Sequence, residues 1–263
     1  MQDGPRFLTE TDLQTTTTTK QTQFGAVGVT ADGRRFRYVS FGGTTTIVPG
    51  VLLQAAVAPA NSQGLTITAT TVSGLTYPNT TATLSAGSTQ LTLTNGATAV
   101  TQDQFAEGFI EVIQTSGSNN GPIQYRIRGN TAAAANTGYV TLFLYEALRN
   151  ASVLVPGTDI ANLWPSPYSA PIITTTVNVP IGVTVNQVVN TSSVTNYGWV
   201  QTAGEAVALQ DASSMVIGNT VGPSTTTAGY VGLAVAATKP AIGWSKVTQS
   251  TGGNTAGIVL NIQ

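Results

Sequence analysis

Short segments rich in Thr, Val and Ile follow one another along almost the whole chain from Phe24 onward, and most are bounded by Gly, Asn, Ser or Pro. Residues branched at Cβ disfavour helix and pack well on a pleated sheet. Regular spacing of such segments is typical of β-sandwiches and barrels, so we predict an all-β protein of sandwich- or barrel-type modules with very little helix. The segments expected to form strands are 24–43 (two strands), 64–72, 88–100, 108–117, 122–130, 138–145, 171–179, 181–189, 197–209, 229–238 and 257–263.

Glycine-containing dipeptides and one polar run predict the local turns. Asp32-Gly33 predicts a tight hairpin within 24–43, and Asn95-Gly96 predicts a second tight turn, because both sequences favour the turns that join antiparallel strands. The run TQDQFAE, Thr101–Glu107, predicts a single capped helical turn.

The first 22 residues carry no apolar periodicity and contain the run LQTTTTTKQTQ. Consecutive β-branched residues resist helix, so we predict that residues 1–22 form an extended N-terminal arm that orders on meeting a partner; a frayed terminus is the alternative. The opening MQDGPRFLTETDLQ lacks an apolar signal core, and we expect no secretory signal on it.

The rest of the chain is predicted to form a β domain at 23–165 and a second β module at 166–263, joined by the Pro-rich stretch Leu163–Pro171. A possible internal sequence repeat suggests that the two modules are related, since TGYVTLFL at 137–144 resembles AGYVGLAV at 228–235. Each copy also follows a Gln-Thr-x-Gly sequence. In a chain so rich in Thr and Gly such matches also arise by chance, and both explanations stay open.

Charge is scarce. Asp, Glu, Lys and Arg make up 8% of the chain and the formal net charge is −1, whereas an average soluble protein has roughly 25% charged residues. A surface built from Thr, Ser, Asn and Gln repels copies of itself weakly, which favours assembly. The balance gives no electrostatic basis for binding nucleic acid, and no apolar run is long enough to cross a membrane.

The chain has no histidine and no cysteine. Mechanisms that use Ser-His-Asp or Cys-His are therefore excluded, as are zinc sites of the usual ligand types, and no nucleotide-binding glycine motif occurs. We expect no catalytic residue, cofactor or metal. Glu107 and Glu111 are the only close acidic pair in a structured segment, but four residues along a strand separates them by about 13 Å, too far for a glycosidase pair.

Basic residues alternate with aromatic ones in GRRFRYV. Arg35 and Arg37 should share one face of the strand, and Arg34, Phe36 and Tyr38 the other. This pattern fits an edge strand protected by charge, or a surface whose Arg side chains meet the carboxylates of a partner.

Two further strand segments carry candidate surface or packing residues. In QYRIRG, Arg126 and Arg128 should share a solvated face. In TNYGWVQTAGEAVAL, Tyr197, Trp199 and Gln201 alternate on one face, and we expect Trp199 to pack within the module or at a subunit contact. A glycan-stacking platform is the alternative for these three residues.

The run ADGRRFRYVSFGGTTTIVPGVLLQAA, Ala31–Ala56, resembles a pattern in head decoration (cement) proteins of tailed bacteriophages. In that family a Gly-Arg-x-Phe-x-Tyr strand precedes a Gly turn and an x-Pro-Gly-x-Leu-x-Gln stretch. The runs Gln102–Asn130 and Ile181–Leu209 are similar to later parts of the same proteins, and the three occur in the family's order. The matched residues of the first run are Gly33, Arg34, Phe36, Tyr38, Pro49, Gly50, Leu52 and Gln54.

The resemblance implies a non-enzymatic structural virion protein, made in the host cytoplasm, that binds the outer surface of the phage head and cements it. The implied partners are the major capsid protein and further copies of the chain, with a trimer favoured over a dimer. Arg34, Arg35, Phe36, Arg37 and Tyr38 become the candidate capsid or subunit interface. The alternative function is a glycan-binding module of a phage host-attachment structure, which would use Trp199 or Trp244 as platforms.

Overall fold

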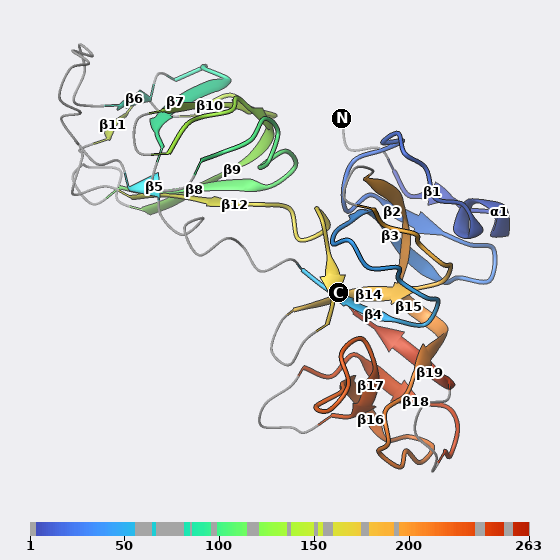
Figure 1. Ribbon diagram of the computed structural model, residues 1–263. Coiled ribbons are helices and arrows are strands. Elements are labelled where there is room, and N and C mark those ends of the chain that lie inside the picture. The colour runs from blue at the N-terminus through green and yellow to red at the C-terminus, as the bar shows by residue number, and fades with distance from the viewer. Residues whose placement is uncertain are drawn as a thin grey trace. The chain divides into compact units, whose positions relative to one another are not determined.

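The chain forms two compact units, unit 1 with residues 1–56 and 167–263 and unit 2 with residues 57–166. Figure 1 shows both in a computed structural model. The structure describes residues 4–55, 65–66, 82–84, 86–95, 99–114, 121–135, 138–149, 152–154, 160–174, 179–191, 195–234, 240–249 and 255–262.

The predicted division into domains differs from the one observed. The boundary after Ser166 falls within the predicted linker Leu163–Pro171, but residues 23–56 belong with the C-terminal half of the chain rather than with 57–165. The reason is long-range pairing, since strand β3 (Arg35–Phe41) lies antiparallel to β15 (Asn196–Leu209) over most of its length. Unit 2 is therefore an insertion between two segments of unit 1.

Unit 1 contains an 11-stranded sheet with the order β1-β2-β3-β15-β19-β18-β16-β17, and β14, β4 and β13 branch from β15. The all-β prediction is confirmed, since α1 is the only helix among the described residues. The remaining elements of the unit are β1 (Arg6–Phe7), α1 (Glu10–Gln14), β2 (Val27–Val29), β4 (Leu52–Gln54), β13 (Ile172–Ile173), β14 (Pro180–Thr184), β16 (Thr220–Pro223), β17 (Val231–Leu233), β18 (Gly243–Ser245) and β19 (Thr255–Asn261).

The predicted hairpin at Asp32-Gly33 joins β2 to β3, with Val29 opposite Arg35. Gly33 has φ = 85°, a left-handed conformation that glycine adopts without a steric cost. The second predicted turn, Asn95-Gly96, extends outside the described residues. The predicted helical turn at Thr101–Glu107 is a series of hydrogen-bonded turns instead, in which the Gln104 side chain accepts a hydrogen bond from the Thr101 N–H.

The prediction of an extended N-terminal arm is wrong for residues 4–22. β1 pairs with β2, and α1 begins with a complete capping box between Thr9 and Asp12. Leu8 and Leu13 flank that box at the positions of a hydrophobic staple, and both are buried. Leu13 is only 1% exposed to solvent. The short amphipathic sequence LTETDL, Leu8–Leu13, precedes the threonine-rich run, and its two leucines anchor the segment to the sheet.

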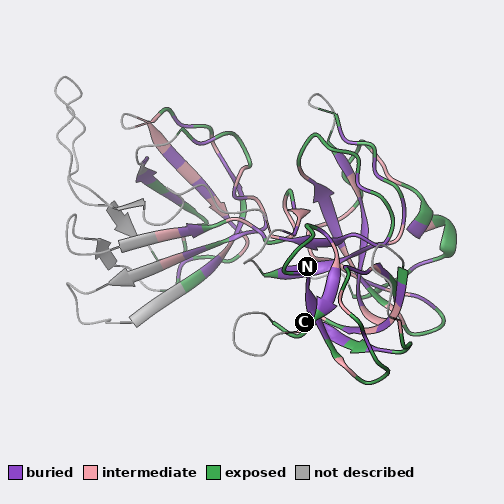
Figure 2. Cartoon of the chain, turned by 60° about the horizontal axis from the view of Figure 1, so that its bottom comes forward, coloured by how far each residue is buried: buried purple, intermediate pink, exposed green. Residues whose placement is uncertain are grey.

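The core of unit 1 lies along its central strands, drawn purple in Figure 2. Alternation in β3 and β15 places Phe36, Tyr38 and Trp199 on one face, where they pack with Leu8 and Leu13. The other face carries Val39, Phe41 and Val200, which are buried in a second cluster. Adjacent apolar clusters continue this core beneath β14 and β4 and beneath β16 to β19.

Unit 2 has a six-stranded sheet of order β5-β12-β8-β9-β10-β7 and a separate pair, β11-β6. Its central strands are antiparallel, and one face buries Ile110, Tyr125, Ile127, Leu142 and Leu163 in a single core. The strands are β5 (Leu65–Thr66), β6 (Ala82–Leu84), β7 (Gln90–Thr94), β8 (Phe109–Gln114), β9 (Gly121–Asn130), β10 (Tyr139–Leu144), β11 (Ser152–Leu154) and β12 (Ile160–Trp164).

The two copies of the possible internal sequence repeat, 137–144 and 228–235, do not occupy equivalent positions in their sheets. In unit 2, β8 pairs with the next strand, β9, which pairs with β10. In unit 1, β15 pairs with β3, β14 and β19, while β17 pairs with β16. The observed pairing therefore does not repeat between the units. Within the described ranges, no helix has the length and hydrophobicity that crossing a membrane requires.

Candidate functional site

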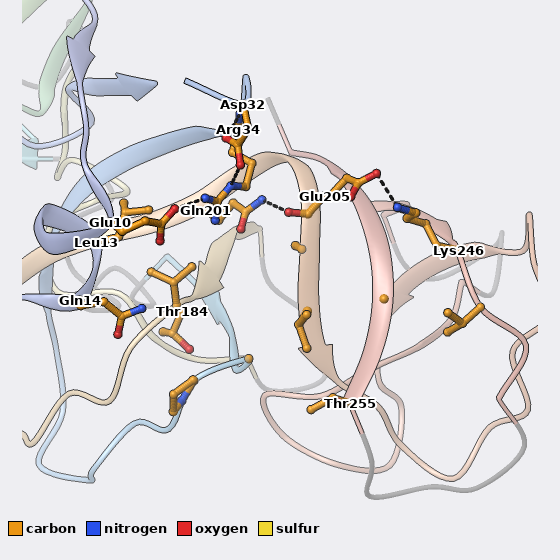
Figure 3. Close-up of a pocket in the computed structure, with 17 residues that line it drawn as sticks. Glu10, Leu13, Gln14, Asp32, Arg34, Thr184, Gln201, Glu205, Lys246 and Thr255 are labelled. Atoms are coloured by element: carbon orange, nitrogen blue, oxygen red, sulfur yellow. Dashed lines mark hydrogen bonds and ion pairs between the residues drawn. The ribbon is translucent and has the colours of Figure 1, made fainter. Parts of the chain in front are cut away.

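A hollow of about 650 Å³ opens beside β15 within unit 1, and Figure 3 shows its lining. Its walls come from α1, the β2–β3 turn, the residues just before β4, the end of β14, β15, the loop after β18, and β19. Leu13, Val185, Val207 and Val247 contribute apolar surface. Charged side chains from four separate parts of the chain surround it, so the hollow combines a partly apolar wall with a polar rim.

A β-bulge in β15 shapes this hollow. The pairing of β15 with β3 shifts register between Gln201 and Ala203, and Gly204 follows with φ = 90°. The Gln201 side-chain amide donates hydrogen bonds to the carbonyl oxygens of Ala203, at 3.2 Å, and Glu205, at 2.6 Å. Bulges of this kind turn side chains away from their regular direction, and here the bulge places Gln201 against the hollow (Figure 3).

Arg34 connects the hairpin turn to α1 at one side of the hollow. Its guanidinium forms ion pairs with Glu10 and, at 2.7 Å from Nε, with Asp32. Burial opposes the charge of Arg34, but hydrogen bonds to Glu10 and Asp32 outweigh burial and raise its pKa above the usual value. A hydrogen bond from the Thr30 hydroxyl, aided by Arg34, lowers the pKa of Asp32. Arg34 and Asp32 therefore stay charged at neutral pH.

A second ion pair, between Lys246 and Glu205, lies at the opposite side of the hollow (Figure 3). Lys246 follows β18 directly, and its backbone N–H donates to the Gly257 carbonyl of β19. Glu205 projects from the exposed face of β15 immediately after the bulge. The pair thus joins two strands that are separated by β19 in the sheet.

The lining contains hydrogen-bonding groups and fixed charges. Its three carboxylates, Glu10, Asp32 and Glu205, are each paired with a cation. Among the described residues, no group of three or more His, Cys, Asp or Glu could hold a metal ion. The arrangement is suited to binding a polar or charged group.

The structure separates the five residues of the predicted interface. Phe36 and Tyr38 are buried in the core of unit 1, so they do not belong to a surface that a partner contacts. Arg34 is engaged in ion pairs, and Arg37 donates to the Gly25 carbonyl at 2.9 Å. Arg35 is exposed. The edge-strand interpretation is also wrong, because β3 pairs with β2 on one side and β15 on the other.

Two of the three residues of the predicted platform, Tyr197 and Trp199, pack in the core cluster of unit 1. Trp199 is 5% exposed and meets Tyr38 edge-to-face with ring centroids 5.2 Å apart, and Tyr197 stacks between Tyr38 and Phe24. The expected shared face is confirmed, and Trp199 packs within unit 1 as expected. It is not available for stacking on a ligand. Gln201 is the member of the set that reaches the hollow.

The predicted residues of unit 2 lie apart from this hollow. Arg126 and Arg128 share the solvent side of β9, as expected, and Arg126 lies over the Tyr145 ring at 5.0 Å. Glu107 is buried just before β8, whereas Glu111 is half-buried and accepts a hydrogen bond from Asn162 at 3.3 Å. Burial, and secondarily the charge of Glu107, raise the pKa of Tyr145.

A buried serine–aspartate contact elsewhere in unit 1 has a structural explanation. Ser224 donates to Asp211 at 2.5 Å and accepts hydrogen bonds from the backbone N–H groups of Thr226 and Thr227. Asp211 also accepts from the Ser213 N–H. These bonds hold the turn after β16 closed, and both Ser224 and Asp211 are buried.

Sequence reasoning missed Glu10, Glu205 and Lys246 as site residues. A glycine inside the strand pattern at Gly204 was the available signal, since glycine there often marks a bulge. Nothing local links Lys246 to Glu205, and only the sheet brings them together.

Comparison with known proteins adds no assignment. No family model matches the chain, no curated protein matches its sequence, and no solved structure matches its fold.

Proposed function

We propose that the chain is a non-enzymatic structural virion protein that binds the outer surface of a tailed-phage head and stabilises the assembled shell. The observation that carries this proposal is the convergence of two runs that resemble decoration proteins. Ala31–Ala56 supplies β3 and β4, and Ile181–Leu209 supplies β14 and β15. These four strands are neighbours in one sheet, in the order β3-β15-β14-β4. Matches scattered by chance have no reason to form one continuous structural element.

The physical character of the chain supports the same function. With 8% charged residues, its surface opposes close packing against a capsid or a second copy only weakly. Many copies on a repeating lattice bind with avidity, so each contact can be modest. The proposed partners are the major capsid protein and other copies of this chain, as a trimer in preference to a dimer.

The test is sedimentation of the purified protein with phage heads that lack it, after its solution mass has been measured by light scattering. Binding that saturates at a fixed ratio of protein to capsid subunit supports the proposal, and an oligomer in solution suggests its lattice symmetry. The absence of co-sedimentation under any salt condition overturns it.

The structure also improves the choice of variants for this test. Reversing Arg34 and Arg37 would break contacts that unit 1 itself uses. Arg35→Glu changes the exposed member of the cluster instead, and Arg128→Glu in unit 2 is a matched reversal of an exposed strand arginine. Weaker head binding for Arg35→Glu alone implicates β3. Equal binding by both variants removes this part of β3 from the contact.

A glycan-binding module is the second candidate, and of the two predicted tryptophan platforms it rests on Trp244 rather than on the buried Trp199. Trp244 is 48% exposed on β18, with Thr220 and Val259 opposite it on the neighbouring strands. An exposed indole of this kind can stack on a sugar ring. A glycan array with the protein and a Trp244→Ala variant tests this candidate, and an array without hits that depend on Trp244 excludes it.

A further inference from the structure

The amide oxygen of Gln201 faces the hollow without a hydrogen-bond donor from the described part of the chain. Its amide nitrogen donates to two carbonyl oxygens, those of Ala203 and Glu205, which can only accept. These two bonds fix the orientation of the amide, so Oε1 must point the other way. Gln201 is 2% exposed and lines the hollow, and Figure 3 shows its oxygen directed away from the Glu205 carbonyl. Because Gln201 lines the hollow, a donor that enters the hollow can bond to this oxygen.

Carboxylates also outnumber cations at the rim. Glu10 and Glu205 each use one carboxylate oxygen, Oε1, in their ion pairs with Arg34 and Lys246. Within the described residues, no hydrogen bond reaches the second oxygen of either carboxylate. The lining holds three carboxylates and two cations, which leaves a net charge of −1. A ligand that donates hydrogen bonds and carries positive charge therefore fits better than an anion.

The wall of the hollow indicates the shape of that ligand. Its apolar part includes the aliphatic side chains Leu13, Val185, Val207 and Val247, and none of its described lining residues is aromatic. Sugar sites commonly use an aromatic face, which this lining lacks. An aliphatic wall that leads to buried and charged acceptors suits a long side chain with an apolar stem and a cationic end.

We propose that the hollow is a socket for a Lys or Arg side chain presented by a partner protein. The stem lies along the aliphatic wall, and the cationic end donates to Gln201 Oε1 and to the free oxygens of Glu10 and Glu205. The identity of the partner rests on the function proposed above, which makes it the major capsid protein. The chemistry of the socket does not depend on that identity.

The socket is tested first with small probes, by titrating the isotope-labelled full chain in NMR experiments. The probes are Nα-acetyl-lysine methylamide, Nα-acetyl-arginine methylamide, the neutral isostere Nα-acetyl-norleucine methylamide and methyl α-glucopyranoside. We expect saturable shifts of the Gln201 side-chain amide and the Gly257 backbone amide with a cationic probe. Amides of unit 2 serve as the internal reference and should not move.

Two variants make the assignment specific. A Cβ at Gly257 meets only Val247 Cγ1 at 3.6 Å and Lys246 Cβ at 4.0 Å, so a side chain is accommodated there and projects beside the hollow. Gly257→Leu should abolish the probe response, and Gly257→Ala is the size control that keeps it. Glu205→Gln should weaken cation binding about two- to fivefold, as expected for one partly exposed charge. Glu146→Gln, in an exposed ion pair of unit 2, is the charge control.

The outcomes separate the socket from the proposed function. Equal shifts with the norleucine probe, or shifts with the glucoside alone, overturn the cationic socket, and the second result makes the hollow a carbohydrate site. No shift with any probe also overturns it. Head binding that survives Gly257→Leu refutes the socket as the capsid contact while the decoration role stands. Probe binding without head binding leaves the socket and refutes the decoration role.

Discussion

Leu13 provides the sharpest test of how the N-terminal segment is held. Replacing Leu13 by Ala removes a side chain that is 1% exposed and packs with Leu8, Phe36, Tyr38 and Trp199. Truncating a fully buried leucine costs about 2–5 kcal/mol, and a value of about 3 kcal/mol is expected because α1 lies at the margin of the core. For a unit of about 150 residues, that loss lowers the Tm by about 6–12 °C.

The assay is urea unfolding followed by the fluorescence of Trp199, which lies in the same cluster. Replacing Trp164 and Trp244 by Phe leaves Trp199 as the only tryptophan, so the signal reports on unit 1. The control is Phe7→Ala, which removes a side chain that is 83% exposed and should change the free energy of unfolding by less than about 0.5 kcal/mol. If Leu13→Ala is as neutral as this control, residues 4–22 are a peripheral arm after all.

Three further results are expected from unit 1. Thr9→Ala removes the N-cap of α1 and should cost about 1 kcal/mol in the same urea assay, whereas Thr9→Asn should retain most of the stability. Gly204→Ala should cost about 1–3 kcal/mol, because φ is 90° and the new Cβ would lie 3.2 Å from Arg34 Cα. The Thr9 hydrogen bonds lower the pKa of Asp12, so their contribution is present above pH about 4 and is lost as pH falls through the folded pKa. Asp12→Asn should therefore flatten the dependence of Tm on pH in acid, and an unchanged slope would contradict this.

Several parts of the fold could be predicted because their signals are local. The hairpin at Asp32-Gly33 follows from the turn geometry that glycine permits, and the shared face of Tyr197 and Trp199 follows from the two-residue period of a strand. The helix α1 was also encoded locally, by Thr9 and Asp12 between two leucines. Its five residues are followed directly by the run Thr15–Thr19, whose β-branched side chains disfavour helix and hide so short an amphipathic pattern.

The candidate site was predicted only in part. Gln201 was identified as one of three alternating residues, of which Trp199 packs in the core as expected, whereas Tyr38, predicted to lie at an interface, is also a core residue. Alternation states which side chains share a face and does not state whether that face meets solvent or another layer. Glu10, Glu205 and Lys246 come from distant positions in the sequence, and only sheet pairing and the placement of α1 bring them to one hollow.

The sequence by itself determined the class of structure, since β-branched segments punctuated by Gly and Asn leave strands as the favourable local conformation. It also determined the low charge that suits packing against a partner. The tertiary structure decided which strands pair, and it inserted unit 2 between the two segments of unit 1. The physical reason is that β3 and β15 gain their stability from backbone pairing and buried area that form only when they meet. The alternation of residues within a strand does not show which distant strand it pairs with. The hollow beside the bulge results from this long-range pairing.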